Sequence, residues 1–334
     1  MPESKLKDRK AEHIKICLEK PVEYEKGNGF EKYEFKHNAL PELSLDDIDI
    51  TTEFLGKKFN APIFVEGMTG GTEYARHINK NLAAGAQAAG IGMGVGSQRT
   101  AIRHPEVEDT YVVRDVAPDI FLLGNLGAAQ LAEYGIDKIK HAVNMIKANG
   151  LAIHLNVGQE AAQPEGDTNW KNVLQEIKNV CSQVNFPIII KETGNGITGD
   201  VAKRLADAGV NAIDVAGAGG TNWIKVEYYR GSKNNDTFFE WGTKTAECLI
   251  QTKEAVSIPI IASGGMRTGL DAAKAISMGA SLVGFALPLL RPATISADSV
   301  KEKLNKIIYE LKTTMLLVGA RNIEELKNTN IHKI

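Results

Sequence analysis

Two glycine-containing segments in the last quarter of the chain could bind an anion. Ser263-Gly264-Gly265-Met266-Arg267 follows one apolar run, and Gly284-Phe285-Ala286-Leu287 overlaps and follows the next. Glycine lets backbone N–H groups approach a ligand closely, and a helix N-terminus favours negative charge. In an eight-stranded barrel, phosphate groups commonly bind at the loops after strands seven and eight. We therefore predict a phosphate cradle with Arg267 as its charge partner; the alternative is glycines that only allow tight turns.

Lys191 ends the apolar run Ile188-Ile189-Ile190 and would point into the mouth of such a barrel. A buried ammonium group is costly unless it meets an anion or an electron-rich partner. Three interpretations stay open. Lys191 could be a Schiff-base nucleophile, a cation beside a flavin ring, or the structural partner of Glu192 or Asp214.

Polar side chains gather in the segment His154-Leu155-Asn156-Val157-Gly158-Gln159-Glu160. Because alternate strand residues share a face, we expect His154 and Asn156 on one side of a strand, with Gln159 and Glu160 in the following loop. Mg²⁺ prefers one or two carboxylates together with phosphate oxygens and water, which makes Glu160 the candidate metal ligand. Each of these residues alone could equally make a structural hydrogen bond.

Two basic clusters lie far from each other in the sequence. Arg9 and Lys10 precede a predicted short helix with an apolar stripe that includes Ile14 and ends before Pro21, and Ser97-Gln98-Arg99 follows the second predicted strand. An isolated N-terminal basic pair is usually solvated. Two clusters combined with a candidate Mg²⁺ ligand suit a diphosphate.

Eight short apolar runs, each followed by a helical pattern, are expected to position these groups. Continuous apolar strands that alternate with amphipathic helices indicate a parallel sheet covered on its outer face. Eight such units predict an α/β fold of the TIM (β/α)₈ barrel type, in which the polar residues at the strand ends converge on one face. The predicted strands are 61–68, 91–96, 120–125, 152–157, 187–192, 212–216, 259–262 and 281–285.

Two segments do not fit the repeat. Residues 1–60 are expected to be an N-terminal extension that caps the bottom of the barrel or reaches across its catalytic face, with the barrel itself over 61–334 as one structural domain. The insert 225–239 is rich in Asn, Gly and Ser and predicts a mobile surface loop. A long final helix is predicted from Leu304, Ile307, Leu311 and Met315.

Composition excludes several classes of partner. The 334 residues carry a formal charge of -2, so no global basic field would attract nucleic acid or an anionic membrane. No run of eighteen apolar residues occurs, and Cys17, Cys181 and Cys248 form no CxxC pair. We therefore expect a protein of the reducing cytoplasm that is not membrane-bound.

The ordered set of motifs resembles the type 2, FMN-dependent isopentenyl-diphosphate isomerases over nearly the whole chain. The segments that carry the resemblance are RKAEHI, MTGG, GSQR, HLN..QE, KE.GNGI and ASGGMRTG. Gly158 and Thr193 depart from the family pattern without removing a functional group. The resemblance implies interconversion of isopentenyl and dimethylallyl diphosphate by addition and removal of protons with reduced FMN. It also implies a homo-oligomer, a tetramer or octamer, and NAD(P)H as the flavin reductant. The alternative is an FMN-dependent oxidoreductase of the 2-hydroxy-acid oxidase type on the same barrel.

The resemblance also assigns individual residues. It implies catalytic roles for Gln159, Lys191 and His154, and Mg²⁺ at Glu160. The implied FMN contacts are Gly67, Met68, Thr69, Ser97, Asn125, Lys191, Thr221, Gly265, Met266, Arg267, Ala286 and Leu287. The implied contacts to the diphosphate substrate are Arg9, Lys10, Ser97, Gln98, Arg99, His154, Asn156 and Gln159.

Overall fold

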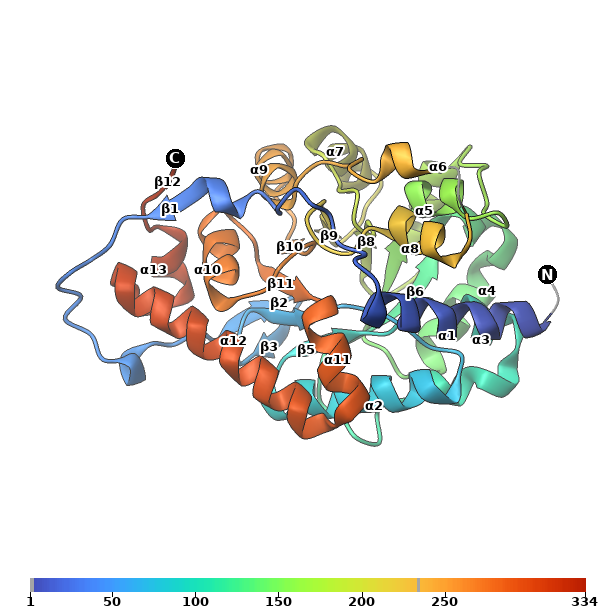
Figure 1. Ribbon diagram of the computed structural model, residues 1–334, viewed down its shortest axis with the longest axis horizontal. Helices are drawn as coiled ribbons and strands as arrows, with labels where there is room; N and C mark the ends of the chain where they lie inside the picture. Colours follow the sequence, from blue (N-terminus) through green and yellow to red (C-terminus); the bar gives the residue numbers. More distant parts are fainter. Residues whose placement is uncertain (1–2, 233–234) are drawn as a thin grey trace.

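A closed barrel of eight parallel strands forms the centre of the computed structural model, which describes residues 3–232 and 235–334 (Figure 1). The hydrogen-bonded order around the barrel is β10-β11-β4-β5-β6-β7-β8-β9, so each strand lies beside its neighbours in sequence. The barrel strands are β4 (Ile63–Val65), β5 (Gly92–Gly94), β6 (Leu122–Gly127), β7 (Gly150–His154), β8 (Ile188–Lys191), β9 (Ala212–Asp214), β10 (Ile260–Ala262) and β11 (Leu282–Phe285).

All eight predicted strands are confirmed in position, and their ends differ by a few residues. The strand that begins at Gly150 already ends at His154, whereas we predicted it to continue to Val157. Asn156 is therefore the residue before a helix, and its proximity to His154 does not come from strand alternation. In contrast, β6 extends to Gly127, so Asn125 lies inside a strand.

Helices surround the barrel because each buries one apolar stripe against the strands or against a neighbouring helix. In α12, Leu304, Ile307, Leu311 and Met315 are fully buried, as predicted for the final long helix. The helices on the outer layer are α2 (Glu73–Ala89), α4 (Leu131–Asn144), α6 (Val173–Gln183), α7 (Gly199–Asp207), α9 (Thr245–Ala255), α10 (Gly269–Ser277) and α12 (Ala297–Val318). Shorter helices are α3 (Arg99–Arg103), α5 (Val157–Ala162), α8 (Trp223–Arg230), α11 (Leu287–Ile295) and α13 (Ile323–Lys327).

The N-terminal sixty residues reach both ends of the barrel. The hairpin of β2 (Thr52–Phe54) and β3 (Lys57–Phe59) packs Phe54 and Phe59 on Phe121, just before β6 begins, and so covers the end at which the strands start. Helix α1 (Glu3–Glu19) lies across the opposite end, beside α8 and α11 (Figure 1). Between them, β1 (Tyr33–Phe35) pairs with β12 (Ile331–Lys333) as a small antiparallel sheet.

Two predictions about local structure were wrong. Arg9 and Lys10 lie within α1 rather than before it. Residues 223–230 form a helix rather than a loop, because the Asn222 side chain caps the N–H groups of Ile224 and Lys225 and the helix is partly buried. Residues 236–238 form a 3-10 turn, and positions 233 and 234 of the predicted loop lie outside the described residues.

Among residues 3–232 and 235–334, no helix combines the length and the apolar character needed to span a bilayer.

Candidate active site

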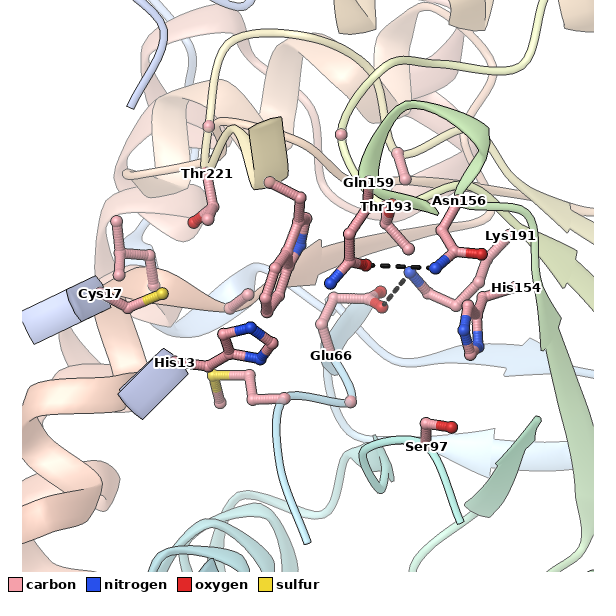
Figure 2. Close-up of a pocket in the computed structure, with 18 of the residues that line it drawn as sticks. His13, Cys17, Glu66, Ser97, His154, Asn156, Gln159, Lys191, Thr193 and Thr221 are labelled. Atoms are coloured by element: carbon pink, nitrogen blue, oxygen red, sulfur yellow. Dashed lines mark hydrogen bonds and ion pairs between the residues drawn. The ribbon is translucent and has the colours of Figure 1, made fainter. Parts of the chain in front are cut away.

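A pocket opens at the end of the barrel where the parallel strands finish, beneath α1 (Figure 2). Residues from all eight strands or the loops that follow them contribute to it, and α1 adds one wall. All but one of the residues implied by the sequence line this pocket: Arg9, Lys10, Gly67, Met68, Thr69, Ser97, Arg99, Asn125, His154, Asn156, Gln159, Glu160, Lys191, Thr221, Gly265, Met266, Arg267, Ala286 and Leu287.

Gln98 is the exception, and its expected contact with substrate is corrected here. Its side chain is fully buried, where Nε2 donates to the carbonyl of Ala142 at 2.7 Å. Its Oε1 accepts from the backbone N–H of Asn125 at 2.8 Å. With both ends of the amide occupied and directed away from the pocket, Gln98 holds β6 in place and so positions Asn125.

Lys191 points into the pocket from the end of β8, where its Nζ lies 3.6 Å from Glu66 Oε2 and 3.6 Å from Asp214 Oδ2 (Figure 2). It also donates to the carbonyl of Glu192 at 2.7 Å. Burial opposes the charged form, but the carboxylates of Asp214, Glu66 and Glu192 outweigh it and raise the pKa of Lys191. A lysine that stays protonated is a poor Schiff-base nucleophile, so the geometry favours a fixed positive charge.

The carboxylate of Glu192 does not form the ion pair with Lys191 that we considered from the sequence, but binds backbone N–H groups. Its Oε2 accepts from the backbone N–H groups of four consecutive residues, 193–196. This ring of donors fixes the loop after β8, in which Thr193 and Gly194 line the pocket. Glu192 therefore shapes the pocket wall, and Asp214 and Glu66 are the carboxylates that face Lys191.

His154 and Asn125 form a hydrogen-bonded pair beside Lys191, because His154 of β7 lies next to Lys191 of β8 in the barrel register. His154 Nδ1 donates to Asn125 Oδ1 at 2.7 Å, since Asn125 Nδ2 is directed to the carbonyl of Val95 at 3.0 Å. Burial, with the nearby charges of Lys191, Lys10 and Arg99, lowers the pKa of His154 to about 3. The imidazole is thus neutral at physiological pH and can act as a hydrogen-bonding group, not as a cation.

Gln159 and Glu160 of the short helix α5, and Asn156 directly before it, line the same pocket. Asn156 Nδ2 lies 3.2 Å from Gln159 Oε1 and 3.1 Å from Glu160 Oε1, so one amide orients both neighbours. Glu160 Oε2 accepts from Gln163 Nε2 and from the backbone of Asp167, each at 2.7 Å. The part of the chain that the structure describes has no cluster of three or more His, Cys, Asp or Glu side chains suited to a metal ion. A cation at Glu160 would therefore need most of its ligands from substrate and water.

A cationic rim is formed where α1 meets the loop after β5 and the end of α8. Lys10 Nζ donates to the carbonyl of Ser97 at 2.9 Å and lies 5.7 Å from the centre of the Tyr111 ring. Burial, followed by the charge of Arg9, lowers the pKa of Lys10 to about 7. Arg9 lies 3.6 Å from Glu165, which also binds Arg230. These groups collect positive charge at a single edge of the pocket.

Sequence reasoning missed a second buried network, centred on Glu227 of α8. Its Oε1 lies 3.0 Å from His13 Nε2 and accepts from Gln159 Nε2 at 3.3 Å, and its Oε2 pairs with Arg230 at 2.8 Å. The His13 ring meets the edge of Trp223 with a centroid distance of 5.2 Å. His13 belongs to the RKAEHI motif, which was a usable signal, but Glu227 fell in the segment that we expected to be a loop.

The anion cradle is built from glycines that no other residue could replace without movement. A Cβ at Gly264 would lie 2.1 Å from the carbonyl oxygen of Gly217, and one at Gly265 would lie 2.4 Å from that of Gly219. Helix α11 begins at Leu287 without a side-chain cap, and Ala286 and Leu287 at its start line the pocket. Arg267 is ion-paired with Glu23 of the N-terminal segment in this structure.

Apolar side chains form another part of the pocket wall. Ile14 and Cys17 of α1, Trp223, and Leu290 of α11 line it. Burial raises the pKa of Cys17 to about 12, so this thiol is neutral and acts as a small apolar group. One pocket thus combines a surface for hydrocarbon with a surface for anions.

Comparison with known proteins agrees with this arrangement. Residues 19–142 and 136–333 match a family described as FMN-dependent dehydrogenase. An isopentenyl-diphosphate delta-isomerase of Thermococcus onnurineus is 50% identical over 333 residues, which cover 96% of this chain and 89% of that protein. The enzyme of the same name from Nostoc sp. is 46% identical over 329 residues, with 96% and 94% covered. Among solved structures, a lactate oxidase of Pediococcus acidilactici superimposes with a TM-score of 0.70 at 20% identity, covering 98% of this chain and 94% of that one. That likeness concerns the fold alone.

Proposed function

From the premise that this chain belongs to the FMN-dependent isopentenyl-diphosphate delta-isomerases, we propose that it interconverts isopentenyl and dimethylallyl diphosphate with reduced FMN and Mg²⁺. It is an isomerase on an FMN-type barrel. The observation that carries the proposal is Lys191, a lysine kept positively charged in a pocket that joins an apolar wall to a cationic rim.

The pocket fits FMN on its own geometry. Gly264 and Gly265 pack so closely against the backbone of residues 217 and 219 that no side chain fits there, and their backbone N–H groups would be the donors to phosphate oxygens. The hydroxyl of Thr69 is buried and has no hydrogen-bond partner within the described residues. Lys191 would neutralise negative charge on the ring. When bound and reduced, FMN supplies an electron-rich surface that stabilises positive charge developing on the tertiary carbon of the alkene.

The cationic rim would hold the diphosphate. Arg9, Lys10 and Arg99 supply positive charge, and the neutral His154 adds a hydrogen bond. Glu160 would contribute one carboxylate to an Mg²⁺ ion whose other ligands are diphosphate oxygens and water. Because these contacts lie away from the reacting carbons, they orient the substrate and exclude water from its apolar end.

Gln159 would orient the proton that leaves or enters the substrate. An amide is a weak acid and base, so Gln159 cannot carry out the transfer alone. Its Nε2 lies 3.3 Å from Glu227 Oε1, and this carboxylate is also in contact with His13. We assign to Glu227 the role of proton acceptor beyond Gln159, with Asn156 fixing the orientation of the amide.

The test compares the protein with a Lys191→Ala variant, both loaded with FMN and reduced by dithionite in the presence of Mg²⁺. Isopentenyl diphosphate should equilibrate with its allylic isomer without consuming reductant stoichiometrically. Loss of one charge aimed at the reacting centre should lower turnover about 100- to 1,000-fold with FMN still bound. Lys203→Ala, on the exposed face of α7, is the control.

Unchanged turnover of FMN-loaded Lys191→Ala would contradict the charge argument. Stoichiometric oxidation of a 2-hydroxy acid, without isomerisation, would instead favour the oxidoreductase alternative. The proposal also includes NAD(P)H as the electron source and a tetrameric or octameric assembly in the cytoplasm. Flavin bleaching by NAD(P)H without oxygen and light scattering of the purified protein test the first two of these.

A further inference from the structure

Glu66 is a buried carboxyl group with no assigned role that lies against Lys191. It follows β4 directly, and only 5% of its surface is exposed. Its Oε2 is 3.6 Å from Lys191 Nζ, and the two side chains point toward each other across the pocket floor (Figure 2). Its Oε1 is buried without a hydrogen-bond partner in residues 3–232 and 235–334. A buried carboxyl oxygen without a hydrogen-bond partner needs an explanation.

The neighbouring strands show which of the two carboxyl groups near Lys191 carries the negative charge. Asp214 Oδ1 accepts from Ser263 Oγ at 2.6 Å and from the N–H of Ala216 at 3.2 Å, so its ionised form is well stabilised. Glu66 shares the ammonium group with Asp214, and its side chain also hydrogen-bonds to the Asp214 carboxyl group, a contact that requires a proton on one of the two acids. Gly284 of β11 packs beside it without a side chain.

The charge balance makes Glu66 the group that exchanges a proton. Burial, followed by the negative charge of Asp214, raises the pKa of Glu66 to about 8, although Lys191 opposes the shift. Glu66 is therefore mainly neutral at pH 7, and Lys191 and Asp214 then compensate each other. Above that pKa, the cluster of one lysine and two carboxylates carries one net negative charge.

We propose that Glu66 is a positioning residue that, through Lys191, takes up a proton when negative charge forms on the cofactor ring. This rests on the proposed function, because it requires a flavin beside Lys191. Electrons and protons balance as follows. A reductant such as dithionite or a hydride donor supplies two electrons, and one proton enters the ring. At a pH above the pKa of Glu66, a second proton converts its carboxylate to the acid. No covalent bond to Glu66 forms or breaks.

A measurable consequence is the pH dependence of the flavin midpoint potential. Each proton taken up with two electrons contributes about 30 mV per pH unit. Below the pKa of Glu66, the acid is already protonated before reduction, and the slope is that of the ring alone, about 30 mV per pH unit. Above it, negative charge on the ring raises the proton affinity of Glu66, and the slope should increase to about 60 mV per pH unit.

The experiment measures the midpoint potential of FMN-loaded protein by spectroelectrochemistry between about pH 6 and about pH 10. Glu66→Gln should abolish the change in slope, and Glu66→Ala should do the same. Glu12→Gln, on the exposed face of α1, removes a carboxylate without touching Lys191 and should retain it. The same slope change in Glu66→Gln as in the parent protein would overturn the proposal.

A second measurement does not depend on the variants folding well. The infrared carbonyl band of a protonated carboxylic acid, recorded as a reduced-minus-oxidised difference, should appear above about pH 8 in the parent protein. Absence of this band overturns the proposal. Isomerase activity is assayed on the same samples: a slope change without isomerisation refutes the proposed function alone, and isomerisation with one constant slope refutes only the role of Glu66.

Discussion

Replacing Lys10 by methionine should separate a functional lysine from a structural one. Lys10 lies mostly buried at the rim of the pocket, with one hydrogen bond to the carbonyl of Ser97 at 2.9 Å. If it binds the diphosphate, Lys10→Met should weaken substrate binding and yet stabilise the fold. A lysine with a purely structural role would instead lose stability on substitution.

The expected loss of diphosphate affinity and the expected gain in stability both follow from the surroundings of Lys10. A hydrogen bond to a charged group contributes about 1.5–3 kcal/mol, so diphosphate affinity should fall about 10- to 150-fold. The drop in pKa from 10.5 to about 7 means that burying the charge costs the fold at most about 5 kcal/mol. Residual solvent contact and loss of the bond to Ser97 reduce the expected gain to about 1–3 kcal/mol.

The pH dependence has a definite sign. Folded Lys10 is charged below about pH 7, so the parent protein should bind diphosphate more weakly as the pH rises through 7. The burial cost is complete below pH 7 and vanishes as the pH approaches 10.5, where the unfolded chain also loses the proton. The stability advantage of Lys10→Met should therefore shrink over that window. Lys10→Arg keeps its charge and should show neither trend.

The assay combines calorimetric titration with inorganic pyrophosphate and urea unfolding, each at several pH values. Pyrophosphate itself gains and loses protons over this pH range. Because the guanidinium group in the Lys10→Arg variant stays charged at every pH, any pH dependence of its affinity comes from pyrophosphate and can be subtracted. Equal pyrophosphate affinity in the parent protein and Lys10→Met would refute the reasoning. The reasoning would also be refuted if Lys10→Met bound pyrophosphate more weakly but had a lower free energy of unfolding than the parent protein at low pH.

Further predictions concern the cofactor and the metal. Gly265→Ala should abolish FMN binding because its Cβ would strike a backbone oxygen at 2.4 Å, whereas Gly56→Ala, with nearly the same φ of +75° and open space, should keep full FMN occupancy by absorbance. Glu160→Gln should lose the Mg²⁺ dependence of turnover, and an unchanged metal titration would contradict the ligand assignment. Glu23→Gln should free Arg267 and tighten FMN binding about 1.5- to 5-fold, as expected for a half-exposed ion pair of about 0.2–1 kcal/mol. Fluorescence titration with FMN measures that change, and weaker binding would count against it.

The barrel could be predicted because each strand is a short apolar run and each turn carries its own local signal. The Ile188-Ile189-Ile190 run is fully buried in β8, and the polar residue that follows it faces the pocket as the fold type requires. Position at a strand end was therefore enough to identify Lys191, His154 and Thr69. The glycine pattern at Gly264 and Gly265 also has a local cause, since it reflects backbone contact.

The remaining features depend on contacts between segments that are distant in sequence. Gln98 follows a strand like its neighbours, and only the position of Ala142 shows that its amide faces outward. Glu227 and His13 are 214 positions apart and meet because α1 crosses the barrel mouth next to α8. The pKa of Glu66 is raised by burial and by Asp214 on another strand, against the opposing charge of Lys191 on a third. No local pattern contains this information.

The pairing of β1 with β12 has a consequence for the order of assembly during synthesis. Phe35 lies opposite Ile331, so the segment that connects α1 to the barrel acquires its partner strand only after residue 331 and all eight barrel strands have been synthesised. A nascent chain can therefore form its barrel strands before β1 pairs with β12, at a stage when this pairing does not yet hold the N-terminal segment that includes Ile14. Stalled translation products that end before residue 331 should then expose their first residues to protease, even where the barrel strands are protected.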